Sequence, residues 1–247
     1  MRAIGILFDS KFSEKLMAEA RLITNKWSSI HAERMSETEY FKEHPTFESV
    51  GTQSELETYS KIEKFFAIQN TLNDINKVFI FLAIDKTKIV SIYPEIESQE
   101  NYFIYHIENY IIRIYTIVDL VGKLGNLLYQ TGIQDEDCNC YKFKEKIKVQ
   151  NIEIGKMLED ILLHVDLIKK RRHKKIHTGE IEIDELKGIS FWKDFSEFLP
   201  ENFDFENPVL KEMNETRFQN MINELHAFLD SLVEKINIFL ESSIDKI

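Results

Sequence analysis

Residues 100–130 read ENYFIYHIENYIIRIYTIVDLVGKLGNLLYQ, and this stretch decides the fold. It is far too long for one strand and contains no proline, and its apolar residues recur at steps of three and four. Such spacing places these residues on one face of a helix that packs against a core. The residues expected on this face are Phe103, Ile107, Ile114, Val118, Val121, Leu124 and Leu128.

The same periodicity extends on both sides of this stretch. Upstream, a helix is predicted from about Ser54 to Ile84, and another from about Ser10 to Glu39 with Asp9 or Ser10 as its N-cap. Downstream, helices are predicted at 151–176 and 212–244. Leu56, Tyr59, Ile62, Phe66, Leu72, Ile75 and Phe79 are expected to form the apolar face of the helix at 54–84.

Composition supports a helical protein, because only 8 Gly and 4 Pro accompany 30% charged residues. We therefore expect an all-α, up-and-down helical bundle with an extra N-terminal helix. Residues 1–52 would form the N-terminal helical extension, and residues 53–247 the bundle.

Two segments depart from the helical period. Tyr141–Val149 alternates lysine with mostly apolar residues, which predicts a half-buried strand. Its lysines would form either a solvated face or a groove for nucleic acid. Residues 180–211 are too long for an empty loop and are expected to pack as short turns.

The chain is long enough, at 247 residues with 43% hydrophobic content, to bury a core without disulfides or metals. Cys138 and Cys140 are too close together to build a disulfide framework, although a metal or redox role for them stays open. The start lacks a secretory signal, and the longest apolar run, 78–84, is too short to span a bilayer. We expect a cytoplasmic protein with no membrane segment.

The run KKRRHKKIH at 169–177 is a basic cluster in a chain of net charge −11. Arg172 continues at helical spacing the apolar stripe that contains Ile154, Leu158, Ile161, Val165 and Ile168. In one interpretation the run is a helix end, with Gly179 as the C′ residue and the cations opposite the helix dipole. In another, Arg172 directs its guanidinium into a cleft.

A metal site at this run is disfavoured. His173 and His177 lie four residues apart, as in zinc hydrolases of the His-Glu-x-x-His type, but Lys174 replaces the glutamate. The surrounding cations would also repel a divalent ion. We expect neither a metal nor another cofactor.

The segment from Arg172 to His177 resembles the Arg-x4–6-His motif of HEPN domains, a superfamily of small helical proteins that includes toxin and phage-defence ribonucleases. The polar residue that commonly follows the arginine is here His173, and an earlier helix has an acidic and a basic residue four apart, Asp119 and Lys123. The resemblance covers about residues 53–247. Many members have a tyrosine two residues after the histidine, where this chain has Gly179.

The resemblance implies a metal-independent endoribonuclease of a toxin–antitoxin or antiviral defence system. Such an enzyme drives the ribose 2′-OH onto phosphorus and leaves a 2′,3′-cyclic phosphate. His177 would transfer protons, Arg172 would stabilise the phosphoryl charge, and His173 would be a further catalytic residue. The residues implied in substrate binding are Lys169, Lys170, Lys174, Lys175, Asp119 and Lys123, although Asp119 and Lys123 also fit an ordinary i,i+4 ion pair.

Helix geometry bears on how this site would assemble. Five residues apart on a regular helix, Arg172 and His177 would point about 140° from each other. They converge within one chain only if the helix ends or kinks between them. The resemblance instead implies a homodimer that brings two Arg-His pairs into one cleft.

Two alternatives stay open. The bundle could be a non-catalytic module that binds RNA or a nucleotide or regulates a partner, or a structural protein whose basic run is only a helix cap. The net charge of −11 confines RNA contact to a local patch and suggests a selective substrate. It also fits a protein partner, such as an antitoxin or regulatory protein, that covers the basic run.

Overall fold

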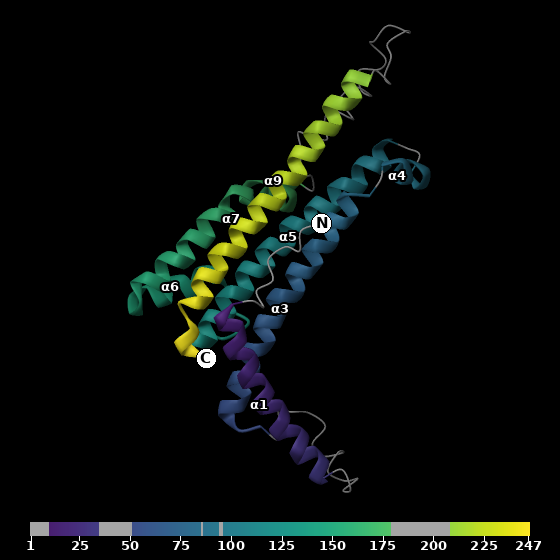
Figure 1. Ribbon diagram of the computed structural model, residues 1–247. Coiled ribbons are helices and arrows are strands. Elements are labelled where there is room, and N and C mark those ends of the chain that lie inside the picture. Colours follow the sequence, from purple (N-terminus) through teal and green to yellow (C-terminus); the bar gives the residue numbers. More distant parts are fainter. Residues whose placement is uncertain (1–9, 35–50, 85, 94–95, 179–207) are drawn as a thin grey trace. The chain divides into compact units, whose positions relative to one another are not determined.

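The computed structural model describes residues 10–34, 51–84, 86–93, 96–178 and 208–247. These residues are helical throughout apart from short connections, and none of them lies in a strand (Figure 1). The predicted all-α class is confirmed. The helices are α1 (Lys11–Arg34), α3 (Gln53–Leu82), α4 (Lys86–Ile92), α5 (Ile96–Tyr129), α6 (Cys140–Gln150), α7 (Ile152–Thr178) and α9 (Pro208–Glu241), followed by the 3-10 turn η4 (Ile244–Lys246).

The described residues form two compact units. The first unit contains the described parts of Leu72–Thr116 and Leu163–Leu232. The second contains those of Gly5–Thr71, Ile117–Leu162 and Val233–Ile247. Each of the long helices α3, α5, α7 and α9 contributes one part to each unit.

The residues of the first unit show the relative direction of the long helices. The first unit combines the later part of α3 with the earlier part of α5, and the later part of α7 with the earlier part of α9. Successive long helices are therefore antiparallel, which is the predicted up-and-down arrangement. Contacts between α3 and α5 agree, because Tyr102 reaches Phe81 while Arg113, further along α5, reaches Asp74 earlier in α3.

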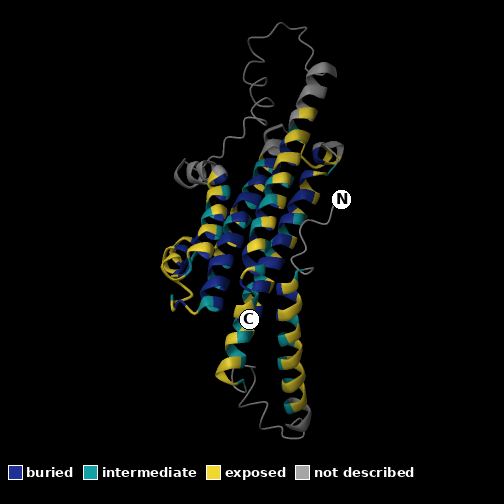
Figure 2. Cartoon of the chain, turned by 60° about the vertical axis from the view of Figure 1, so that its left-hand side comes forward, coloured by how far each residue is buried: buried dark blue, intermediate teal, exposed yellow. Residues whose placement is uncertain are grey.

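Most of the predicted apolar faces are buried (Figure 2). All seven residues named for 100–130 are at most 5% exposed, and so is most of the stripe of α7. The face predicted for α3 is partly wrong. Phe66 is 38% exposed and Tyr59 is 36% exposed, whereas the adjacent Phe65 is fully buried. Phe65 packs against Phe12 of α1, with ring centroids 5.9 Å apart and planes tilted by 46°, so the phenylalanine that turns inward contacts the N-terminal helix.

Helix α6 occupies the segment that the sequence predicted as a strand, and that prediction is wrong. Asn139 caps the helix, with its side chain accepting from the backbone N of Lys142 at 2.9 Å. The residues buried along α6 are Cys140, Phe143, Lys144 and Ile147, a helical spacing of three and four. The alternation placed Lys144 on an exposed face. In the helix its stem is buried, while its ammonium reaches Glu145 at 2.8 Å.

Two glycines allow α6 to approach α5 closely in the second unit. A Cβ at Gly122 would overlap the backbone of Cys140, and a Cβ at Gly125 would overlap the ring of Phe143. The one-turn spacing of these glycines opens a continuous strip on α5 for α6. The packing of α6 therefore depends on backbone that carries no side chain.

The start of α1 packs within the second unit. Ser10 is the N-cap, as predicted, with its hydroxyl accepting from the backbone N of Ser13 at 3.1 Å. Phe12 is fully buried, and its backbone N donates to Glu241 at 3.2 Å. Lys15 of α1 also donates to the carbonyl of Ile244 at 2.9 Å, so the beginning of α1 is tied to the C-terminal turn.

Candidate nucleic-acid interface

Helix α7 carries the basic run. Asn151 caps the start of α7, with its side chain accepting from the backbone N of Ile154 at 3.2 Å. The buried stripe of α7 continues to Ile168, which is 8% exposed. The helix does not end between Arg172 and His177, since it runs to Thr178. The side chains of Lys169, Lys170, Arg172, His173, Lys174, Lys175 and His177 lie outside the described residues, as do Gly179 and most of the predicted turns at 180–211.

Because α7 is uninterrupted, the angle between the Arg172 and His177 positions around the helix axis follows from regular helix geometry. Five residues of regular helix place the Arg172 and His177 positions about 140° apart around α7. One chain therefore does not bring the two positions onto a common face of this helix.

A contact in the first unit shows which residues of α5 lie at the level of the motif along the helix axis. The Tyr115 hydroxyl of α5 donates to the carbonyl of Val165 in α7 at 3.2 Å. Because the two helices are antiparallel, Arg172, seven residues further along α7, lies near the level of Glu108 on α5. By the same count His177 lies near the level of Phe103.

At this level of α5 four aromatic rings form a cluster. His106 is buried, at 8% exposed, and stacks on Phe81 of α3 with centroids 4.8 Å apart and planes 14° from parallel. Tyr102 and Tyr105 meet the same imidazole edge-on, at 4.5 and 5.2 Å. Phe81 and Tyr105 remain 42% and 61% exposed. We call Phe81, Tyr102, Tyr105 and His106 the aromatic cluster.

Two members of the aromatic cluster, His106 and Tyr102, have pKa values that burial shifts in the direction that disfavours their charged forms. Burial lowers the pKa of His106, so its imidazole is neutral. Burial also raises the pKa of Tyr102, whose hydroxyl donates to the carbonyl of Phe81 at 3.1 Å. These two rings thus carry no ionic charge at neutral pH.

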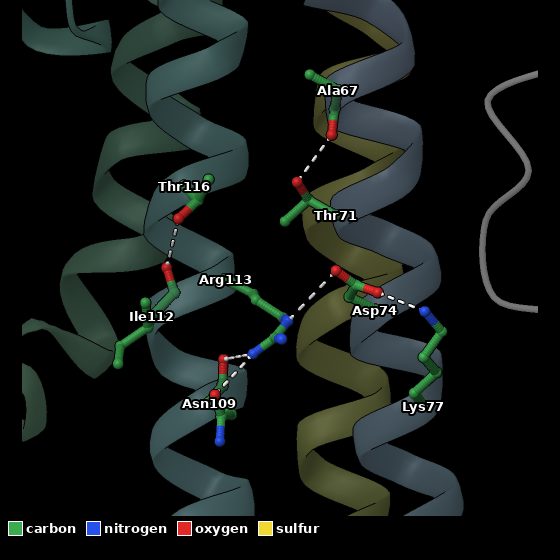
Figure 3. Close-up of polar contacts among 8 residues, drawn as sticks. All are labelled: Ala67, Thr71, Asp74, Lys77, Asn109, Ile112, Arg113 and Thr116. Carbon is green, nitrogen blue, oxygen red and sulfur yellow. Dashed lines mark hydrogen bonds and ion pairs between the residues drawn. The ribbon is translucent and has the colours of Figure 1, made fainter.

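A polar seam lies between α3 and α5 (Figure 3), and its Asn109 follows His106 of the cluster by three residues. Arg113 donates to the side-chain oxygen of Asn109 at 2.8 Å and lies 3.9 Å from Asp74. Asp74 also pairs with Lys77 at 2.7 Å, and the hydrogen bond from Lys77 lowers the pKa of Asp74. Two cations share one carboxylate, so the seam carries a surplus positive charge. We call Asp74, Lys77, Asn109 and Arg113 the polar seam.

Asp119 and Lys123 belong to the second unit, whereas the basic run belongs to the first. Lys123 lies 3.2 Å from Asp135, which Lys64 of α3 also approaches at 3.0 Å. Partial burial acts to raise the pKa of Asp135, but the bonds from Lys64 and Lys123 outweigh it and lower the pKa. Lys123 therefore has a carboxylate partner in the loop before α6.

Both cysteines are buried and free. Burial raises the pKa of Cys138, and raises that of Cys140 to about 12, so both thiols are protonated at neutral pH. Within the described part of the chain, no group of three or more His, Cys, Asp or Glu side chains is placed to hold a metal ion. No described helix is long and apolar enough to cross a membrane.

An all-helical, up-and-down bundle with a basic run late in one long helix defines a class of small helical domains. The family described as HEPN_Cthe2314-like HEPN matches residues 67–237, which is well over half of the chain. The protein belongs to this family and so to the HEPN superfamily, as the Arg-x4-His resemblance predicted. No curated protein and no solved structure matches the chain.

The sequence interpretation missed the aromatic cluster and the polar seam. Tyr102, His106, Asn109 and Arg113 recur at steps of four, three and four, so they share one face of α5. This pattern was visible in the sequence, but the apolar face that includes Phe103 and Ile107 dominated the interpretation. Nothing in the sequence placed Phe81 or Asp74 opposite that face.

Proposed function

We propose that this protein is a metal-independent endoribonuclease of a bacterial toxin–antitoxin or antiviral defence system. HEPN domains serve as nucleases, as other RNA-related modules or as nucleotide-binding modules. This chain contains a HEPN domain. The observation that carries the narrower proposal is the Arg172-x4-His177 motif, located on an uninterrupted helix of a HEPN-family chain.

The chemistry follows from the two residue types. The ribose 2′-OH attacks the adjacent phosphorus while His177 accepts its proton, and His173, one turn earlier in α7, is the second histidine candidate. The bond to the 5′-oxygen breaks, and that oxygen receives a proton. Arg172 holds the charge on the phosphoryl oxygens with a planar pair of donors. The products are a 2′,3′-cyclic phosphate and a free 5′-OH.

Assembly of the site requires a second copy of the chain. The Arg172 and His177 positions are about 140° apart on one helix, so a single α7 does not direct both at one phosphate. In a two-fold dimer, the arginine of one protomer and the histidine of its partner would meet in one cleft. Lys169, Lys170, Lys174 and Lys175 would then attract the RNA backbone in a salt-dependent manner.

A second candidate is a non-catalytic module that binds RNA or a nucleotide. Gly179 favours it, because it stands where many HEPN proteins have a tyrosine. In either case the charge of −11 over the whole chain restricts RNA to local patches of positive charge.

The test measures cleavage of labelled single-stranded RNA by the parent and by His177→Ala and Arg172→Ala. Lys156→Ala is the matched control, since it removes an exposed cation from the same helix. We expect both motif variants to lose cleavage and the control to retain it. Cleavage should persist in excess EDTA and leave a cyclic phosphate.

Three outcomes would contradict parts of this proposal. If both motif variants cleave like the parent, Arg172 and His177 are not the site. If EDTA stops the reaction, the metal-independent mechanism is wrong. If the parent binds RNA in a salt-dependent manner without cutting it, the non-catalytic candidate replaces the nuclease.

A further inference from the structure

The aromatic cluster leaves two large rings on the surface of the first unit. Tyr105 is 61% exposed and Phe81 is 42% exposed, although both contact the buried His106. The contacts with His106 hold these rings in place, so little side-chain entropy is lost when a ligand packs on them. The cluster is thus a preformed aromatic surface.

The polar seam supplies charge beside this surface. Arg113 lies seven residues beyond His106 on the same face of α5, about 10 Å along the helix axis. Its hydrogen bond to Asn109 orients the guanidinium, Asp74 attracts it from 3.9 Å, and Lys77 is 67% exposed. Fixed aromatic rings followed by two cations are the combination that proteins use to hold single-stranded nucleic acid.

We propose that the aromatic cluster stacks an unpaired nucleobase of single-stranded RNA and that Arg113 and Lys77 hold the neighbouring phosphates. This inference rests on the proposed function, because it supplies the substrate contacts of the same enzyme. The cluster and the motif occupy the same level of the first unit, since His177 lies near the level of Phe103 and Arg172 near that of Glu108. His106 lies nine residues from Tyr115, about 180° around α5, so the cluster is on the α3 side of α5 and would hold unpaired RNA away from the scissile phosphate.

A nucleobase fits the observations better than a protein partner does. A base offers two flat faces that stack on Tyr105 or Phe81 whatever its identity, and its phosphates match the surplus positive charge of the seam. A protein surface that packed on the rings would bury Lys77 and Arg113 together with Asp74, at a desolvation cost. RNA phosphates would use these cations directly.

The test measures binding of a short 2′-O-methyl oligoadenylate, which lacks the attacking hydroxyl and so reports affinity without cleavage. Tyr105→Ala and Phe81→Leu should each weaken binding about tenfold, and Tyr105→Phe should bind like the parent because the ring remains. Ile112→Ala is the matched control, since Ile112 is also on α5, is 57% exposed and has no ring. It should leave the affinity unchanged.

An abasic nucleotide separates stacking from charge. When the stacked base is removed from the oligonucleotide, Tyr105→Ala should cost no further affinity, whereas Arg113→Gln should still weaken binding. If Tyr105→Ala weakens intact and abasic oligonucleotides equally, the ring does not stack on a base.

Further outcomes identify which proposal fails. If the parent cleaves RNA but Tyr105→Ala and Phe81→Leu bind and cleave like it, the stacking site is wrong and the proposed function stands. If these variants change only the oligomeric state, the rings form a protein interface. If the parent neither binds nor cleaves RNA, the proposed function fails and this site fails with it.

Discussion

Phe79 of α3 and His226 of α9 lie face to face in the first unit, with ring centroids 3.6 Å apart and planes 15° from parallel. Burial lowers the pKa of His226, and the charge of Asp230 one turn later only partly opposes this effect. Together with the aromatic cluster, this pair gives the first unit two imidazoles that the fold keeps neutral.

These imidazoles predict that acid destabilises the protein. The unfolded chain takes up protons near the ordinary histidine pKa of 6.5, whereas folded His226 and His106 resist protonation. The unfolded state therefore binds more protons, and stability falls as pH drops below that value. Thermal unfolding from about pH 7.5 to about pH 5.5 should show this loss.

Two variants test whether His226 causes the loss of stability at low pH. His226→Phe removes the titrating group and should reduce the dependence of the unfolding midpoint on pH. Phe79→Leu lowers the midpoint but keeps the imidazole, so the pH dependence should persist. Equal pH slopes for His226→Phe and the parent would show that His226 does not contribute.

The close approach of α5 and α6 gives a second prediction. Gly122→Ala should destabilise the protein by about 1–3 kcal/mol, because its Cβ would overlap the backbone of Cys140. Alanine ordinarily favours a helix interior over glycine by about 1 kcal/mol, so the sign of the effect is diagnostic. Chemical denaturation measures it, with Thr116→Ala at an exposed position of the same helix as the control. A stabilised Gly122→Ala variant would mean that α6 is not packed there.

The long helices could be predicted from the sequence because each buries a face that repeats at the helical period. The stripe of α7 from Ile154 to Ile168 and that of α5 from Phe103 to Leu128 are both buried. Helix α6 could not be predicted in this way. Lys144 lies on its buried face and hides the helical spacing, and only the Asn139 cap signals a helix.

The candidate site was predictable only in part. The resemblance to the family was visible in a short segment of the chain, from Arg172 to His177. The aromatic cluster instead joins Phe81 of α3 to His106 of α5, and the polar seam joins Asp74 to Arg113. Such pairs arise when two helices pack in a particular register, which local periodicity does not fix.

Lys123 and Lys64 provide a matched pair for the third prediction. Both bind Asp135, at 3.2 and 3.0 Å, and their side chains are similarly covered, at 24% and 25% exposed. If Lys123 serves only this loop, Lys123→Met and Lys64→Met should each cost at most about 1 kcal/mol and leave RNA cleavage intact. If Lys123 contacts substrate, only Lys123→Met should reduce cleavage. Denaturation and cleavage assays on the same preparations distinguish the two roles.

The last prediction concerns a site shared by two protomers. Because α7 holds Arg172 and His177 about 140° apart, we expect a two-fold dimer whose cleft takes the arginine from one chain and the histidine from the other. Sedimentation should show a dimer at micromolar protein. Arg172→Ala and His177→Ala should each be inactive alone, but after mixing and subunit exchange about half of the dimers are hybrids that contain one intact arginine and one intact histidine. These hybrids should regain part of the parent's cleavage. A mixture that forms hybrids yet stays inactive would mean that the arginine and histidine must come from the same chain, or that both copies of each are required; a parent that sediments as a monomer while cleaving RNA would rule out the shared cleft.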